Sequence, residues 1–213
     1  MRTPSLELAE SWGGNRMSDS ADYYDTHAEQ FYRDTVGVNM GALYARFLQH
    51  VPVGQPILDA GCGSGRDALA FKKLGYPVSA FDASEAMAIK ASELLGQPVV
   101  VQLFEQFKET PRYNGIWACA SLLHLPEAKI PEVFTRLWEA LLPEGVLYCS
   151  FKYGDGERVK DERFFTDANE QRAQQWTQHL LDCNRQESWL TEDQRPGRVE
   201  QWFNLLLFKA AVA

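Results

Sequence analysis

The sequence predicts an α/β fold in which a mostly parallel sheet carries helices on both faces. Three observations support this prediction. Apolar stretches of strand length alternate with helical patterns of about ten residues from residue 56 onward. Gly or Pro separates most of these stretches and ends the preceding element. The last two predicted strands have no helix between them, so we expect an antiparallel hairpin at one edge of the sheet.

The chain before this alternation divides into a leader and a helical cap. Residues 1–18 are polar and aperiodic, which predicts a flexible leader. Aromatic residues such as Tyr24 and Phe31 then recur at helical spacing, so one face of a first helix should carry rings. A second helix is expected over 40–50. We therefore assign residues 19–52 to an N-terminal helical cap.

Residues 53–213 form the predicted main domain. Aliphatic and β-branched stretches predict strands, and amphipathic stretches predict helices. The expected strands are 57–59, 78–82, 99–103, 115–118, 145–151, 187–191 and 202–209. The expected helices are 66–74, 85–95, 131–142 and 166–181. Ser84 is a suitable N-cap because its hydroxyl can accept a hydrogen bond from a backbone N–H of the first turn.

Composition argues against several classes of protein. The 213 residues carry a net charge of −8, which disfavours a nonspecific grip on nucleic acid or on an anionic membrane. The four cysteines form no C-x-x-C pair and fit no zinc template, so we expect no metal and a reducing compartment. The sequence shows neither a secretory leader nor an apolar stretch of membrane length. We therefore expect a cytoplasmic monomer or homodimer.

The stretch "ILDAGCGSGRDALAF" marks the edge of the sheet where a ligand should bind. It places Gly61, Gly63 and Gly65 directly after the first predicted strand. In open α/β sheets, ligands bind beyond the carboxyl ends of the strands, and glycines let a ligand approach the backbone closely. The glycines alone could also belong to an ordinary tight turn between a strand and a helix.

Two acidic residues narrow the choice of ligand. Asp59 ends the first strand, where a carboxylate would repel a pyrophosphate but suits a ligand with a positive charge. Asp82 ends the second strand, where a carboxylate can accept hydrogen bonds from ribose hydroxyls. The implied ligand has a cationic group and a ribose but no phosphate. S-adenosylmethionine fits this description.

Three successive motifs, "ILDAGCGSGRDALAF", "VSAFDAS" and "IWACASLLHLP", resemble those of class I S-adenosylmethionine-dependent methyltransferases. Within that family the sequence resembles the small-molecule group related to tellurite-resistance and ubiquinone-type methyltransferases. The resemblance extends roughly over residues 23–209. It implies a Rossmann-like seven-stranded sheet of order 3-2-1-4-5-7-6, with the last strand antiparallel and helices on both faces.

The resemblance also implies cofactor-binding roles at the matching positions. Around the methionine part of the cofactor would lie Asp59, Gly61, Cys62, Gly63 and Gly65. Along the ribose and adenine would lie Asp82, Ala83, Met87, Phe104 and Glu105, although many relatives carry an aspartate in the region "VQLFEQF". Under the sulfonium would lie Ala120 and Ser121, with Tyr24 and Phe31 in a covering helix. Ala83, Met87 and Ala120 could instead be core residues, and the covering helix could simply pack on the domain.

The acceptor should lie over the same edge of the sheet. The sequence indicates no catalytic triad, and methyl transfer from a sulfonium needs no protein nucleophile. His124 could be a general base or a loop histidine with a structural hydrogen bond. The substrate candidates are His124, Lys152, Tyr153, Arg195 and Arg198.

The segments "KYGDGERVKDERFF" and "EDQRPGR" bring five basic residues to this edge. They are Lys152, Arg158, Arg163, Arg195 and Arg198. On a protein of net charge −8, such a cluster suggests an acceptor with an anionic group. The same residues could also be solvated loop charges that pair with neighbouring acids.

The leading hypothesis is an enzyme that transfers a methyl group from S-adenosylmethionine to a small-molecule acceptor, without a nucleic-acid or membrane partner. An alternative is a regulatory protein that binds the cofactor but transfers nothing. A nucleotide-dependent oxidoreductase is disfavoured by Asp59, and by G-x-G-x-G in place of G-x-G-x-x-G.

Overall fold

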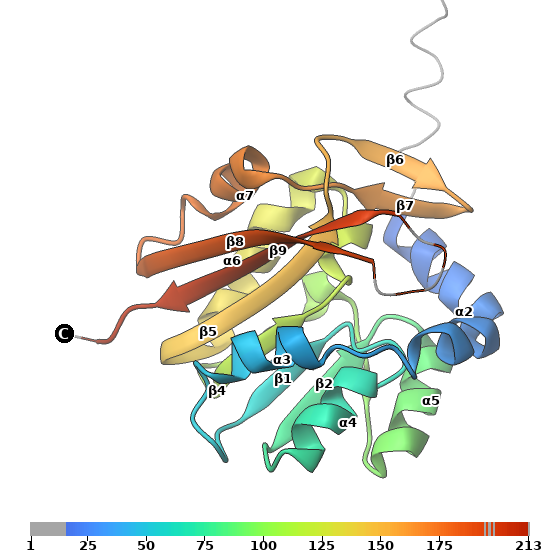
Figure 1. Cartoon of the computed structure of the whole chain (residues 1–213), viewed down its shortest axis with the longest axis horizontal. Helices are drawn as coiled ribbons and strands as arrows, with labels where there is room; N and C mark the ends of the chain where they lie inside the picture. The colour runs from blue at the N-terminus through green and yellow to red at the C-terminus, as the bar shows by residue number, and fades with distance from the viewer. Residues whose placement is uncertain (1–15, 194, 196, 198, 213) are drawn as a thin grey trace, which may run out of the picture.

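The computed structural model describes residues 16–193, 195, 197 and 199–212. It contains a seven-stranded sheet of order β3-β2-β1-β4-β5-β9-β8 (Figure 1). The strands along the chain are β1 Ile57–Ala60, β2 Val78–Asp82, β3 Val100–Val101, β4 Tyr113–Ala118, β5 Leu141–Lys152, β8 Cys183–Glu192 and β9 Gln201–Lys209. Strands β1 to β5 pair in parallel, and β9 is antiparallel to both β5 and β8. The predicted strand order and the antiparallel last strand are confirmed.

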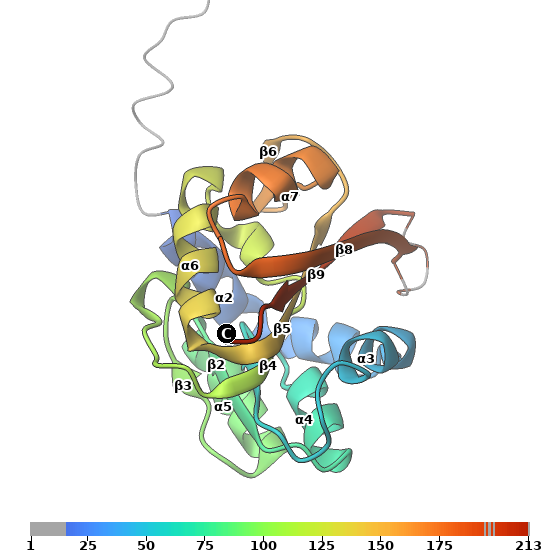
Figure 2. The same cartoon turned by 90° about the vertical axis from the view of Figure 1, so that its left-hand side faces the viewer.

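Helices cover both faces of this sheet (Figures 1 and 2). They are α2 Arg16–Thr35, α3 Gly41–Leu48, α4 Arg66–Lys73, α5 Glu85–Leu95, α6 Ile130–Ala140 and α7 Glu170–Thr177. Three short 3₁₀ turns are η1 Phe104–Gln106, η2 Leu122–His124 and η3 Glu127–Lys129. The expected N-cap of α5 is confirmed, because the Ser84 hydroxyl accepts a hydrogen bond from the Met87 amide over 3.1 Å.

Neighbouring residues of the central strands serve two separate cores. Trp117 and Tyr148 are buried with Phe47 of α3, whereas the adjacent Ile116 and Leu147 are buried in the core that contains α6. Side chains alternate between the two faces of a strand, so each central strand must be apolar on both sides. This double burial holds the carboxyl ends of β1, β4 and β5 in fixed positions.

The structure corrects the expected course of residues 153–181. The segment expected to be a loop forms a second sheet of two strands, β6 Glu157–Lys160 and β7 Arg163–Thr166. Its turn is made by Asp161 and Glu162 at φ +51° and +61°, positions that glycine or asparagine usually supply. The predicted helix 166–181 was therefore too long: α7 begins only at Glu170, after the N-cap Asn169.

Other boundaries differ at the ends of the sheet and at the N-terminus. Helix α2 begins at Arg16, inside the segment 1–18 that was expected to be a leader. Strand β3 contains only Val100 and Val101, which are more than half exposed at the edge of the sheet. Strand β5 starts earlier than expected, at Leu141. Ends of elements follow tertiary contacts more than local sequence.

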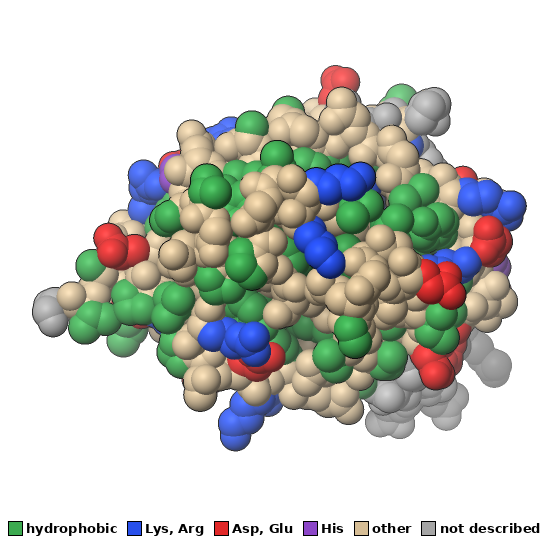
Figure 3. All heavy atoms as spheres, turned by 90° about the horizontal axis from the view of Figure 1, so that it is seen from below, with side chains coloured by type: hydrophobic (Ala, Val, Ile, Leu, Met, Phe, Trp, Pro, Cys, Tyr) green, Lys and Arg blue, Asp and Glu red, His purple; other side chains and the backbone are tan. Residues whose placement is uncertain are grey.

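The surface is mixed in character. On the face shown in Figure 3, basic, acidic and hydrophobic side chains are interspersed, and the net negative charge is not gathered in one patch there. No helix in the described part of the chain has the length and apolarity needed to cross a membrane.

Candidate functional site

A cavity of about 590 Å³ lies at the carboxyl edge of the parallel strands, which is the predicted ligand edge. Its wall includes residues that follow β1, β2 and β4, together with residues of β5, of α2 and of the hairpin β6–β7. This volume falls within the range of roughly 300–1,000 Å³ that is usual for small-molecule sites. The strand ends and the crossover loops thus enclose one continuous space.

The glycine loop after β1 forms one wall, and two of its glycines are sterically required. Gly61 lines the cavity at φ +72°, and a Cβ there would lie 2.5 Å from the Cβ of Ser121. Gly65 has φ +76°, and its Cβ would lie 3.1 Å from the backbone of Ala91 in α5. Gly65 does not line the cavity, so its role is to let α4 and α5 pack closely.

Asp82 lies at the end of β2 and holds the glycine loop. Its Oδ2 accepts a hydrogen bond from the Gly63 amide over 2.7 Å, and its Oδ1 accepts one from the Ser84 amide over 3.0 Å. Burial raises the pKa of Asp82, although the backbone N–H donors oppose this shift. A carboxylate has about four lone-pair sites, so Asp82 can accept further hydrogen bonds from hydroxyls in the cavity.

Asp59 lies behind the loop rather than in it. Its side chain is buried and accepts a hydrogen bond from the Ala68 amide over 3.0 Å, in the first turn of α4. Burial raises the pKa of Asp59 well above its ordinary value, and the nearby charges of Asp67 and Asp82 raise it further. Asp59 is not part of the cavity wall. It connects β1 to α4.

Arg66 and Asp67 line the cavity, although the sequence analysis assigned them no role. Asp67 accepts hydrogen bonds from the Tyr44 hydroxyl and, over 2.8 Å, from the Trp117 indole. Arg66 pairs with Asp67 and donates to the Thr35 carbonyl over 3.2 Å. Both residues stand in the quoted motif, but an Arg-Asp pair at the start of a helix is a weak signal. Only the fold shows that this network ties α2, α3, α4 and β4 together.

An apolar wall follows β2 and β3. Ala83, Met87 and Phe104 line the cavity, and Phe104 packs edge-on against Phe81 with ring centres 5.1 Å apart. Glu105 does not line it, and its buried Oε2 has no hydrogen-bond partner among the described residues. A flat apolar slot next to Asp82 suits an aromatic base joined to a ribose.

The backbone after β4 is strained where it borders the cavity. Ala120 has φ +52°, and its amide donates to the Ser150 hydroxyl over 2.9 Å. The Ser121 hydroxyl donates to the Ala60 carbonyl over 2.8 Å, which ties this turn to β1. A residue other than glycine in this region costs about 1 kcal/mol or more and is typical of functional sites. Cys119 also lines the cavity, and burial raises the pKa of its thiol to about 12, so it is protonated at neutral pH.

Helix α2 covers the cavity. The Tyr24 hydroxyl and the Nε2 atom of His124 are 2.8 Å apart, and the Nδ1 atom of His124 lies 2.8 Å from the Phe164 carbonyl. A carbonyl can only accept, so Nδ1 donates, and Nε2 of the neutral ring accepts the Tyr24 proton. Burial lowers the pKa of His124 to about 4, which keeps the ring neutral. His124 therefore holds α2 against η2 and β7.

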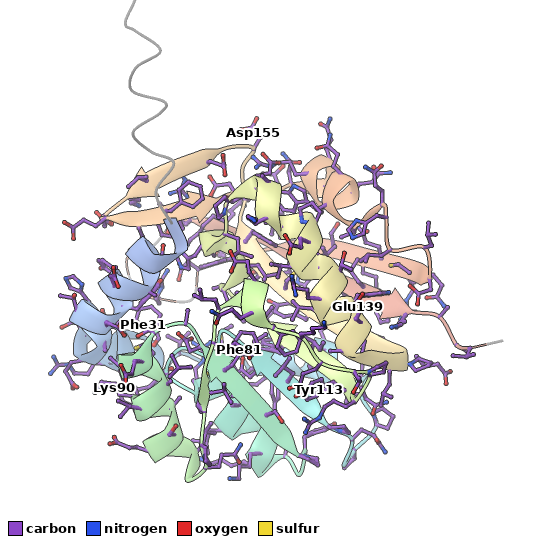
Figure 4. The ribbon with its side chains drawn as sticks, turned by 180° about the vertical axis from the view of Figure 1, so that it is seen from behind. Phe31, Phe81, Lys90, Tyr113, Glu139 and Asp155 are labelled. Atoms are coloured by element: carbon purple, nitrogen blue, oxygen red, sulfur yellow. The ribbon has the colours of Figure 1, made fainter. Side chains whose placement is uncertain are left out.

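The other side of α2 rests on α5. Asp25 accepts hydrogen bonds from the Ser84 hydroxyl and, over 3.0 Å, from the Ala86 amide. Glu29 pairs with Lys90 of α5. Figure 4, which views the molecule from behind, labels Phe31 of α2 and Lys90 of α5 at the same end of the molecule. Phe31 also lines the cavity, next to Gly63.

Aromatic and charged side chains make up the remaining part of the wall. The aromatic residues are Tyr148, Phe165, Trp189 and Trp202. Lys152 is buried, with its ammonium 3.7 Å from the centre of the Trp202 ring. It pairs with Asp193 over 3.2 Å and with Glu200 over 2.7 Å. Arg195, which also lines the cavity, pairs with the same Asp193.

The family model described as a methyltransferase domain matches residues 25–194. The chain belongs to this family. S-adenosylmethionine is the methyl donor of the family. The match includes part of α2, the glycine loop and the hairpin β6–β7, so most of the residues that line the cavity lie within the matched segment.

Individual relatives agree with this assignment. A protein of Geobacillus sp. (strain WCH70) that is named as a methyltransferase is 29% identical over 136 residues, 59% of this chain. The chain spans about half the length of that relative, 54%.

Two solved structures are similar in fold. The 1,6-didemethyltoxoflavin-N1-methyltransferase of Burkholderia thailandensis, with S-adenosylhomocysteine, has a TM-score of 0.72 and 19% identity, covering 99% of this chain and 93% of its own. The magnesium protoporphyrin IX methyltransferase of Synechocystis PCC 6803 has a TM-score of 0.71 and 17% identity, covering 98% and 100%.

The cavity of this methyltransferase domain fits the cofactor of the family. The carboxyl groups of Asp67 and Asp82 line the cavity and suit a cationic ligand. Asp82 has acceptor sites left for hydroxyls, and the slot beside Phe104 is apolar.

Most of the predicted site residues line the cavity of the domain. They are Tyr24, Phe31, Gly61, Cys62, Gly63, Asp82, Ala83, Met87, Phe104, Ala120, Ser121, His124, Lys152 and Arg195. Outside the wall lie Asp59, Gly65, Glu105 and Tyr153. Tyr153 follows the last residue of β5 and is 45% exposed. Arg198 lies outside the described residues.

Proposed function

We propose that this chain transfers a methyl group from S-adenosylmethionine to a small-molecule acceptor that carries an anionic group. One observation supports this most strongly: the cavity continues from the glycine loop and Asp82 to the aromatic and basic residues near Trp202 and Lys152. A site that only sensed the cofactor would not need this second region. The continuous space therefore favours an enzyme over the regulatory alternative.

The cofactor half of the cavity comprises the glycine loop, the residues after β2 and η1, and the turn after β4. In our proposal Asp82 accepts hydrogen bonds from the ribose hydroxyls, and Ala83, Met87 and Phe104 enclose the adenine. Gly61 and Gly63 leave room for the methionine part, and Asp59 acts from behind through the amide of Ala68. We place Ala120 and Ser121 beside the reacting centre, because both residues line the cavity in the turn after β4.

When bound, the cofactor supplies an electrophilic methyl group on a sulfonium. The chain itself contributes alignment and the exclusion of water. Helix α2 closes the cavity through the hydrogen bond from Tyr24 to His124. His124 already accepts this proton, and its pKa is lowered to about 4, so it positions the cover rather than acting as a strong general base. No other residue is assigned to proton removal.

The acceptor half comprises Phe165, Trp189 and Trp202 together with the basic residues of the hairpin β6–β7 and of β5. Its aromatic walls suit a flat or apolar body, and its cations suit an anionic group. The motifs also favour the group related to tellurite-resistance and ubiquinone-type methyltransferases. Tellurite and carboxylated phenols are therefore the first acceptors to screen.

Isothermal titration calorimetry with S-adenosylmethionine and S-adenosylhomocysteine tests this proposal. We expect both compounds to bind the wild-type chain. Incubation with the acceptor panel should then accumulate S-adenosylhomocysteine, which distinguishes an enzyme from a regulatory protein. If neither compound binds, the proposal fails. Binding without turnover of any acceptor would favour the regulatory alternative.

A further inference from the structure

Carboxylates already neutralise most of the basic residues in the acceptor half. Lys152 pairs with Asp193 and Glu200, and Arg195 pairs with Asp193. Lys160 of β6 pairs with Glu200 over 3.2 Å. A cation that is held in this way has little capacity left to recognise an anionic ligand.

Arg158 is neutralised in the same way. Two of its guanidinium nitrogens donate to the two oxygens of Asp167, over 2.8 and 2.9 Å. This bidentate geometry uses the edge of the guanidinium that would otherwise bind a carboxylate. Arg158 and Arg163 stand on neighbouring strands of the same hairpin, β6 and β7, so they offer a direct comparison.

Arg163 differs from these four basic residues. It lines the cavity, its side chain is 19% exposed, and its buried Nε has no hydrogen-bond partner among the described residues. Its ion pair with Asp161 spans 3.9 Å, too long for a hydrogen bond, and Asp161 is 64% exposed. A solvent-exposed pair of this kind contributes little. Among the described residues, therefore, no carboxylate lies within hydrogen-bond distance of the Arg163 guanidinium.

Aromatic rings hold the face of the Arg163 guanidinium. Its guanidinium carbon lies over the ring of Tyr23, 4.8 Å from the ring centre, and over the ring of Phe165 at 5.3 Å. Cation–π contacts engage this face and do not use the N–H groups. Arg163 also hydrogen-bonds the Tyr24 hydroxyl, and both this bond and its charge oppose the rise in the pKa of Tyr24 caused by burial. The Tyr24 oxygen therefore uses part of the donor capacity of Arg163, and a guanidinium with five N–H groups keeps donors for a ligand. It is thus positioned under the covering helix.

We propose that Arg163 selects the acceptor by binding a carboxylate attached to an aromatic body. This inference rests on the proposed methyltransferase function and adds the chemical class of the acceptor. A carboxylate matches the guanidinium edge in two parallel hydrogen bonds, and the rings of Phe165 and His124, 5.1 Å apart, lie beside it. The methionine carboxylate of the cofactor is the other possible source of this group, and the test below separates the two sources.

The test uses binding to the intact chain saturated with S-adenosylhomocysteine. The probes are benzoate, nicotinate and indole-3-acetate, each compared with its neutral amide. We expect at least one carboxylate to bind about tenfold or more tightly than its amide, the difference that a charge-assisted hydrogen-bonded pair provides. Arg163→Gln should remove this preference, and Arg163→Lys should keep part of it. Both variants should bind S-adenosylhomocysteine like the wild type.

Arg112→Gln is the matched control, because it makes the same substitution at an arginine that is 57% exposed, pairs with Glu109 and does not line the cavity. It should change carboxylate binding less than about twofold, as expected for an exposed, already paired charge. The inference is overturned if the wild type prefers no carboxylate over its amide, or if Arg112→Gln and Arg163→Gln lose the same affinity. A loss of S-adenosylhomocysteine binding in Arg163→Gln would also overturn it and assign Arg163 to the cofactor. Failure of the wild type to bind S-adenosylhomocysteine would instead refute the methyltransferase proposal itself.

Discussion

The cofactor half and the acceptor half of the cavity are formed by different parts of the chain. Backbone turns and short side chains make the cofactor half, within one stretch from β1 to η1 and the turn after β4. Long side chains make the acceptor half, and they come from α2, β5, the hairpin β6–β7, β8 and β9. The shape of the cofactor half depends on the backbone conformation of its turns. The shape of the acceptor half depends on how its side chains pair. Substitutions there can therefore change the specificity for the acceptor while cofactor binding stays constant.

The most severe change should be Gly61→Val, which places a side chain where a Cβ already lies 2.5 Å from Ser121, at φ +72°. We expect cofactor affinity to fall by about a hundredfold or more, because strain and steric overlap add up. Gly156→Val is the matched control, since a Cβ there meets nothing within 4 Å. Calorimetry measures affinity, and circular dichroism checks the fold. Equal affinity for both variants would contradict a cofactor half defined by its backbone.

Asp82→Asn should cause the second-largest loss of cofactor affinity. It keeps the shape but removes the charge, and it turns one acceptor into a donor facing the amides of Gly63 and Ser84. We expect a loss of cofactor affinity of about 1–3 kcal/mol, or roughly fivefold to 150-fold. Asp155→Asn is the control, because Asp155 is exposed and lies away from the cavity. Unchanged affinity in Asp82→Asn would separate Asp82 from the ribose.

Tyr24→Phe tests the contact that holds α2 over both halves of the cavity, because it removes the hydroxyl that binds His124. We expect the dissociation rate of S-adenosylhomocysteine to rise about fivefold, consistent with the loss of one hydrogen bond of about 1 kcal/mol. Stopped-flow displacement measures this rate. Tyr153→Phe is the control, since Tyr153 lies outside the cavity wall. A changed association rate with an unchanged dissociation rate would show that α2 does not close over the cofactor.

The smallest effect should be a dependence on pH. Burial raises the pKa of Asp82 in the free protein, and a cation bound nearby would lower it again. Binding of S-adenosylmethionine should therefore release protons, and its affinity should fall by roughly a few-fold as pH drops from 7.5 to 5.5. Calorimetry in two buffers of different ionisation enthalpy measures the protons released. Proton uptake, or the same pH dependence in Asp82→Asn, would contradict this assignment.

The same difference between the halves explains what the sequence could predict. The strand order and the ligand edge were predictable, because the alternation of strands and helices and the loop with Gly61 are local patterns. The cavity lining near Asp82 and Phe104 was predictable for the same reason. The two-stranded hairpin was not, since its turn uses Asp161 and Glu162 at positive φ and carries no glycine.

The pairing of charges was the other feature that the sequence could not supply. From the sequence alone, the five basic residues of the two segments are equivalent candidates for binding an anionic group. Lys152 meets its partners Asp193 and Glu200 only 41 and 48 residues later, through the pairing of β5 with β9. Asp59 was predicted in contact with the ligand, but its carboxylate is directed to the amide of Ala68. The partner of each charged side chain depends on residues that are distant in the sequence, and local sequence patterns do not reveal them.

The attachment of α2 on two sides has a kinetic consequence. Asp25 and Glu29 hold this helix to α5 beside the cofactor half, and Tyr24 holds it to His124 beside the acceptor half. The non-helical residue His27 lies between Asp25 and Glu29, inside the segment that is attached to α5. A helix fastened in this way uncovers both halves in one movement. The departure of methylated product and of spent cofactor would then share one rate, and turnover would be limited by the opening of a helix rather than by the chemical step.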